Sequence, residues 1–179
     1  NACEPRPASG FAAIEADLRT LGQVLQREPQ AHQLIARQRA DLARARQLAA
    51  QHAPLSVFYL DSEHNGLDSE GARGFVTELI AVAGGRNLFA KVDLHRVTVN
   101  PETLLQHDPD VIILADAVWS PALRKRTFLR NHPALSRLRA VRENRLIDLP
   151  FTHLVAGEHS ARAAVELATQ LRDMAEHRP

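Results

Sequence analysis

The chain has 179 residues, of which 45% are apolar, so it can bury one sizeable core and indicates a single domain or one large lobe. Its formal net charge of +1 argues against a dedicated nucleic-acid-binding protein, because such proteins carry a clustered basic face. No apolar run approaches the roughly 18 residues of a transmembrane helix, and we expect no signal peptide.

The first third of the chain is predicted to form a loop and two helices. Prolines and a glycine place residues 1–10 in the loop. Apolar residues recur at helical spacing over 11–25, and Pro29 then occupies the start of a second helix. This helix continues to about residue 52 without a further proline or glycine, which makes it roughly 35 Å long.

Strands and helices alternate beyond Pro54. The apolar run 55–60 predicts a strand, and the polar stretch 61–74 predicts a loop. A helix is predicted at 75–83. The glycine pair that follows it, which begins at Gly84, supplies a left-handed cap that turns the chain back.

The stretch 96–114 is predicted to contain a strand, a short helix and a second strand. Val97 and Val99 alternate with a polar residue, as in a strand with one buried face. Asn100, which a proline follows, is a good N-cap for the helix. The run 111–114 is aliphatic and uninterrupted, as in a strand that is buried on both faces of a parallel sheet.

The last third continues the alternation. Because strands that alternate with helices pair in parallel through right-handed crossovers, we predict an α/β fold. It is a three-layer α/β/α sandwich with a mainly parallel sheet, preceded by a long linking helix. The remaining elements are a loop at 115–120, helices at 121–129 and 133–138, a strand at 145–149, a loop at 150–157 and a closing helix at 158–176.

Three stretches in a fixed order carry a resemblance to one family. In 96–114 a glutamate in the first helical turn is followed by Leu-Leu, Asp-Pro-Asp and four aliphatic residues. Residues 75–89 form a helix followed by an Ala-Gly-Gly-x-Asn turn, and 135–149 form a short helix followed by x-Ala-Val-Arg-x-x-Arg-Leu. Together they resemble the class III periplasmic substrate-binding proteins, which are the receptors of ABC importers for ferric siderophores, haem and cobalamin.

The resemblance implies that residues 54–179 form the carboxyl-terminal lobe of such a protein and that 1–53 contain the helix that links its two lobes. We expect the amino-terminal lobe to be absent, so that this chain binds ligand weakly or not at all. The surface that faced this lobe should carry an exposed apolar patch. The implied function is noncovalent capture of an iron chelate, or of cobalamin or haem, followed by delivery to the importer's permease. Lobe movements should be small because the linking helix is rigid.

Ligands of parallel sheets bind beyond the carboxyl ends of the strands, which selects the three loops after residues 60, 114 and 149. Their carboxylate, imidazole and aromatic groups suit a polar or metal-chelated ligand. Trp119, the single tryptophan, can stack with Phe151 on a planar ligand, although closing the edge of the core explains it equally well. The candidate ligand-binding residues are Glu63, His64, Asn65, Asp68, Asp116, Trp119, Phe151, Thr152 and His153.

No direct metal site and no cofactor are predicted. His64 and His153, with Glu63 or Asp116, offer suitable atoms, but they come from separate loops without ligand spacing. Most of the nine histidines are expected to be ordinary surface residues. A metal ion already enclosed by its chelator needs no ligand from the protein.

Glu102 is the candidate contact to the permease. The resemblance implies that a glutamate in this place lies on the outer surface of the lobe and pairs with arginines of the permease. The alternative is that Glu102 only stabilises the start of its helix, by about 0.3–1 kcal/mol. Both can hold, because a surface carboxylate that serves a partner still interacts with the helix dipole.

An enzyme is not indicated. The chain has no Gly-x-Ser-x-Gly elbow, no phosphate-binding glycine-rich loop and no Cys/His nucleophile pair. Two alternatives remain open. One is a small α/β enzyme related to chelatases, which needs a complete cleft within this chain, and the other is an interaction module built on the long helix.

Cys3 is the only cysteine, so no intrachain disulfide forms. It is either the lipid-bearing first residue of a mature bacterial lipoprotein or an internal thiol near a cut end. The pair Asn1-Ala2 resembles the remnant of an expression tag and favours the internal thiol. The expected location is the periplasm or cell envelope, with membrane contact only through the permease or a lipid anchor.

Overall fold

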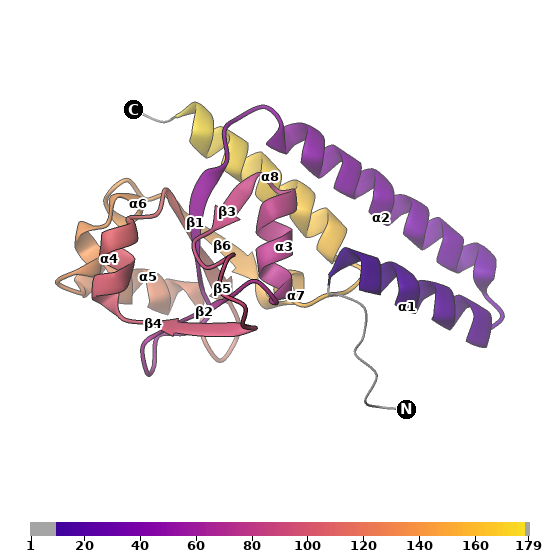
Figure 1. The fold of residues 1–179 in the computed structure, drawn as a ribbon, viewed down its shortest axis with the longest axis horizontal. Helices are drawn as coiled ribbons and strands as arrows, with labels where there is room; N and C mark the ends of the chain where they lie inside the picture. The colour runs from indigo at the N-terminus through magenta and orange to yellow at the C-terminus, as the bar shows by residue number, and fades with distance from the viewer. Residues whose placement is uncertain (1–9, 178–179) are drawn as a thin grey trace.

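The computed structural model describes residues 10–177. They form a four-stranded sheet with a layer of helices on each face (Figure 1). All pairings in this sheet are parallel, in the strand order β3-β1-β5-β6. The predicted three-layer α/β/α sandwich is confirmed. The strands of the sheet are β1 (Leu55–Leu60), β3 (Gly85–Asn87), β5 (Val111–Asp116) and β6 (Leu146–Pro150).

Each face of the sheet has its own apolar core. Val57 and Tyr59 of β1 belong to the core on one face, whereas Phe58 and Leu60 belong to the core on the other. Successive residues of a strand point to opposite faces, so a strand covered on both sides must be apolar throughout. The same burial explains the uninterrupted aliphatic run 111–114 in β5.

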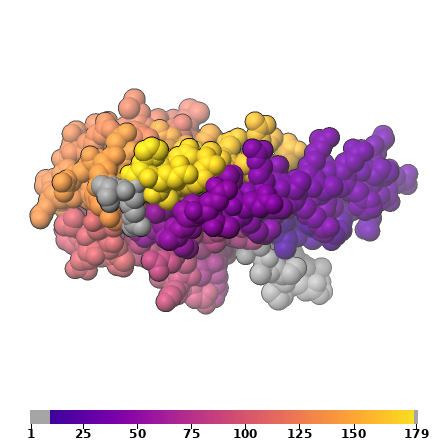
Figure 2. All heavy atoms as spheres, turned by 90° about the horizontal axis from the view of Figure 1, so that it is seen from above, coloured from indigo at the N-terminus to yellow at the C-terminus, as the bar shows by residue number. Residues whose placement is uncertain are grey.

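One face is covered by α3 (Phe75–Val82) and α8 (Ser160–Glu176), and α2 (Glu28–Ala49) packs along α8 (Figures 1 and 2). The preceding helix, α1 (Phe11–Val24), folds back along α2. The side-chain amide of Gln38 fastens the two by donating to the carbonyl oxygen of Phe11 at 3.0 Å. The end of this helix pair projects beyond the sheet (Figure 1). The long helix ends three residues earlier than the sequence predicts.

Shorter helices cover the other face of the sheet. Asn100 caps the first of them as predicted, because its side chain accepts a hydrogen bond from the backbone N–H of Thr103 at 2.7 Å. The helix stops at Asp108, whose φ of 37° is left-handed. These elements are α4 (Pro101–His107), α5 (Ala122–Asn131), the 3-10 turn η1 (Leu135–Arg137) and α6 (Arg139–Arg142).

Three predictions about local structure are wrong. The predicted loop 61–74 contains β2 (Leu67–Glu70), which pairs in antiparallel fashion with β4 (Arg96–Val99), so the predicted strand at 97–99 lies outside the parallel sheet. Gly84 does cap α3 with a φ of 90°, but the residues after it form a further strand of the sheet, β3, where no strand is predicted. The predicted loop 150–157 begins with a helical turn, α7 (Phe151–Leu154).

Large exposed apolar residues gather in two places. One group, which includes Leu21, Leu25 and Leu34, lines a shallow groove at the free end of α1 and α2. The other lies beyond the carboxyl ends of β5 and β6. None of the helices within residues 10–177 has the length and apolar composition of a membrane span. Apart from Gly10, the predicted loop 1–10 and Cys3 lie outside the described residues.

Candidate functional site

The three candidate loops lie side by side at one edge of the sheet. Leu60 at the end of β1 pairs with Leu114 of β5, and Asp116 at the end of β5 pairs with Pro150 of β6. The chain therefore leaves these three strands at neighbouring points. We call this edge the rim, and it comprises residues 61–66, 117–123 and 151–155.

A tight turn at 117–120 presents two apolar side chains at the rim. Ala117 and Ser120 exchange backbone hydrogen bonds of 2.9 and 3.3 Å, which leaves Val118 96% exposed and Trp119 68% exposed. The indole packs edge to face on Phe151, with ring centroids 5.0 Å apart and planes at 72°. Trp119 is too exposed to close the edge of the core, so its packing on Phe151 joins two of the predicted site residues.

A buried lysine of α5 supports the 117–120 turn through two hydrogen bonds to the main chain. The ammonium group of Lys125 in α5 is fully buried and donates to the carbonyl oxygens of Ala115 and Ser120, at 2.6 and 2.7 Å. Burial lowers the pKa of Lys125, and the nearby carboxylate of Glu63 opposes that shift. At the same place Asp116 Oδ1 accepts the backbone N–H of Ala122 at 2.9 Å and so caps α5.

The first rim loop contains Glu63, which holds the guanidinium group of Arg124. The carboxylate of Glu63 is almost entirely buried, and its Oε1 lies 2.7 Å from Nε of Arg124. The guanidinium group also lies 3.3 Å from Ser120 Oγ and 3.5 Å from His64 Nε2. Because the Arg124 side chain remains 44% exposed, it offers positive charge at the rim while Glu63 fixes its position.

The other predicted site residues are placed as follows. Asp68 lies in β2, where its carboxylate accepts hydrogen bonds of 2.6 Å from Ser62 and Thr98. His153 lies 3.7 Å from the carboxylate of Glu166 in α8. In the part of the chain that the structure describes, no three His, Cys, Asp or Glu side chains are close enough to hold a metal ion. The remaining candidates, Asn65, Thr152 and the helix-start residue Glu102, are exposed.

Sequence analysis missed Arg124 and Lys125. Both lie inside α5, on the side of the helix that faces the rim and the 117–120 turn. Only the presence of two lysines among 22 basic residues marked Lys125 as unusual. For Arg124 the sequence contained no comparable signal.

A half-buried carboxyl group links β2 to α3. Oε2 of Glu70 accepts the backbone N–H of Val76 at 2.9 Å, and burial raises the pKa of Glu70 above its ordinary value of 4.5. Nearby, the hydroxyl of Tyr59 donates to Asp61 at 3.0 Å, and Arg96 pairs with the same carboxylate. Burial also raises the pKa of Tyr59, which therefore stays protonated.

Glu70 should make the stability of the fold depend on pH. A carboxyl group with a raised pKa in the folded protein favours folding at low pH, and this contribution is lost as the pH rises through that pKa. Glu70→Gln keeps an acceptor for Val76 and removes the titration. Between about pH 4 and about pH 8, urea unfolding should show the variant gaining stability over the parent as the pH rises. A constant difference across this range would contradict the expectation.

Comparison with known proteins decides the family. The family model described as "Periplasmic binding protein" matches residues 3–152, which is most of the chain. The chain belongs to the periplasmic binding protein family. Comparison with curated protein sequences gave no match. Because these proteins bind solutes without catalysing a reaction, the expectation that the chain is not an enzyme is confirmed.

Solved periplasmic binding proteins share the fold. The chain is similar to one from Veillonella parvula, with a TM-score of 0.83, 22% identity, and coverage of 92% of this chain and 58% of that one. For a protein of an ABC-type Fe3+-hydroxamate transport system from Saccharomonospora viridis the values are 0.81, 22%, 94% and 58%. For the haem-binding protein RhuT from Roseiflexus they are 0.78, 27%, 91% and 63%. The chain therefore spans 58–63% of the length of these proteins.

Proposed function

We propose that this chain is the carboxyl-terminal lobe and linking helix of the substrate-binding protein of an ABC importer for iron chelates. The observation that carries the proposal is the rim, where the exposed Trp119–Phe151 pair stands beside Arg124 at the carboxyl ends of adjacent parallel strands. Family membership supports the proposal, as do the solved relatives from an Fe3+-hydroxamate transport system and from haem binding.

The chemistry of the rim suits an anionic chelate with flat organic groups. An exposed indole packs well against planar or apolar parts of a ligand, and a guanidinium group pairs with carboxylate or other oxygen anions. A ferric siderophore combines both kinds of group. Haem, which is planar and carries two carboxylates, is the second candidate that the Trp119–Phe151 pair favours, and cobalamin is the third.

The helix pair supports a two-lobed arrangement. We propose that residues 1–53 link the lobes and that 54–179 form one lobe. The apolar groove at the free end of α1 and α2, around Leu21 and Leu25, would then face the second lobe. Glu102 would dock on arginines of the permease from its exposed place in the first turn of α4. The protein would work in the periplasm or at the cell envelope, and it would contact the membrane through the permease.

Ligand titration followed by the fluorescence of Trp119, the single tryptophan, tests this function. Because a second lobe supplies half of the pocket, this chain alone should bind ferric siderophores, haem and cobalamin more weakly than about 1 µM. In a protein that carries both lobes, Trp119→Ala should weaken binding by about tenfold or more, which isothermal titration calorimetry measures without a tryptophan reporter. Glu102→Ala is the matched control, which should reduce uptake by the importer and leave binding unchanged.

Two outcomes would contradict the proposal. The first is micromolar or tighter binding of any of these ligands to this chain alone, since it would mean that the site is complete without a second lobe. The second is unchanged ligand affinity in the Trp119→Ala variant of the two-lobed protein.

A further inference from the structure

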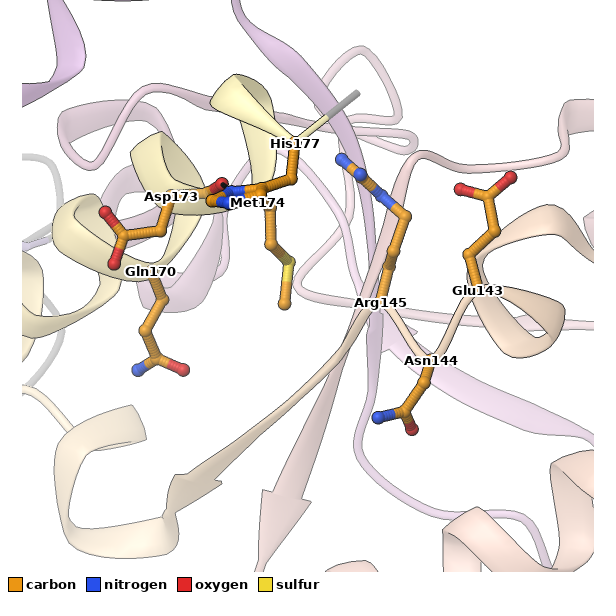
Figure 3. A pocket seen from close by; sticks show the side chains of 7 residues that line it. All are labelled: Glu143, Asn144, Arg145, Gln170, Asp173, Met174 and His177. Atoms are coloured by element: carbon orange, nitrogen blue, oxygen red, sulfur yellow. Dashed lines mark hydrogen bonds between the residues drawn. The ribbon is translucent and has the colours of Figure 1, made fainter. Parts of the chain in front are cut away.

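A second pocket lies at the opposite end of β6 from the rim. It has a volume of about 610 Å3, and seven side chains line it (Figure 3). Residues 143–145, which lead into β6, form one wall, and the last turns of α8 form the other. The rim follows the carboxyl end of the same strand. Five residues of extended chain, roughly 17 Å, therefore separate the two places.

The pocket contains a buried arginine with an unused donor. Arg145 is only 7% exposed, and its Nε donates to the main-chain carbonyl oxygen of Asp110 at 2.8 Å. Its Nη2 is buried and has no hydrogen-bond partner among the described residues. The side chain extends toward the end of α8 (Figure 3). An unsatisfied charged donor is costly, so an oxygen anion that enters the pocket and accepts from Arg145 gains a charge-assisted hydrogen bond.

The charges that line the pocket are mixed, because Glu143 and Asp173 are acidic and Arg145 is basic. The segment 124–145, which runs from the rim to the pocket, holds eight of the 22 basic residues and one of the 21 acidic residues, so it has a formal charge of +7 and the rest of the chain −6. Within the pocket, Asp173 is paired with Arg172 at 2.7 Å. Glu143 is exposed and is the carboxylate that opposes an anion. The thioether side chain of Met174 supplies an apolar surface in the lining.

We infer that this pocket binds a small organic anion that joins a carboxylate or phosphate group to a short apolar body. The oxygen anion pairs with Arg145 and the apolar body packs against Met174, which stands on the facing wall (Figure 3). The site does not depend on the rim or on the proposed transport function. It adds a second ligand to the protein, at the end of the lobe away from the first.

The chain contains one methionine and one tryptophan, so each site has its own reporter. With 13C-labelled methionine methyl groups, the single Met174 signal reports the pocket, and the Trp119 indole signal reports the rim. Benzoate and phenyl phosphate should shift the Met174 signal in a saturable way below about 10 mM and leave Trp119 unchanged. The neutral benzamide and the cationic benzylamine match benzoate in size, and they should not shift the Met174 signal.

Two variants test the charge assignment. Glu143→Gln removes the opposing carboxylate and should tighten benzoate binding about two- to fivefold. Arg145→Met should weaken it about tenfold or more, with urea unfolding used to verify that the variant is folded. An equal Met174 response to benzamide, the absence of a saturable response to either anion, or weaker binding in Glu143→Gln would overturn the inference. If Arg145→Met fails to fold, the Glu143→Gln result still tests whether the pocket binds an anion.

Discussion

Replacing Lys125 with methionine is expected to lower the free energy of unfolding by about 2–4 kcal/mol. Methionine keeps the long unbranched side chain but cannot donate, so the carbonyl oxygens of Ala115 and Ser120 lose the ammonium donor, and Ser120 keeps only the weaker hydrogen bond from Ala117. A hydrogen bond to a charged group contributes about 1.5–3 kcal/mol. The desolvation that lowers the pKa of Lys125 also disappears, and this relief offsets part of the loss. Urea unfolding at pH 7, followed by circular dichroism, measures the difference.

The only other lysine supplies the control. Lys91 is exposed, so Lys91→Met should change the free energy of unfolding by no more than about 0.5 kcal/mol. The Lys125→Met variant should also shift the emission of Trp119, because the turn that presents the indole loses its support. If stability and emission both stay at the parent values, Lys125 does not hold this turn.

The parts of the fold that sequence reasoning located carry local physical signals. Asn100 marks the start of α4 through its side-chain hydrogen bond, and Gly84 marks the end of α3 through its positive φ. The missed strands carry no such signal. β2 has the sequence Leu-Asp-Ser-Glu and is a strand only because β4 pairs with it from about 30 residues away. Pairing between distant segments cannot be inferred from the composition of either one.

For the candidate site, too, the sequence predicted some features and missed others. The rule about strand ends placed Trp119 and Phe151 at one edge, and the structure brings their rings into contact. The rule does not distinguish side chains that face a ligand from those that hold the loops. Glu63 and Asp116 make internal contacts, with Arg124 and with the start of α5, and their role in binding stays a prediction. The exposed guanidinium group at the rim belongs to Arg124 in α5, and tertiary packing decides which side of a helix faces a site.

A second large effect is expected from Asp110→Ala, which should cost about 2–4 kcal/mol of unfolding free energy. The Asp110 carboxylate is only 8% exposed. It pairs with Arg139 at 2.6 Å and accepts two hydrogen bonds of 2.8 Å from Ser56, at the start of the neighbouring strand. Removing it leaves the N–H and hydroxyl of the half-buried Ser56 without an acceptor, whereas Arg139, whose side chain is 40% exposed, stays partly solvated. Urea unfolding should show a lower midpoint with little change in slope.

Exposure, not the length of the ion pair, should decide the size of this effect. Arg73 and Asp93 make an equally short pair of 2.6 Å, yet their side chains are 58% and 76% exposed. Surface pairs contribute about 0–1 kcal/mol because water solvates both ions once they separate. Asp93→Ala should therefore cost less than about 1 kcal/mol, and added salt should reduce the cost further. Equal losses in Asp93→Ala and Asp110→Ala would show that burial of the Asp110 network does not stabilise the joint between β1, β5 and α6.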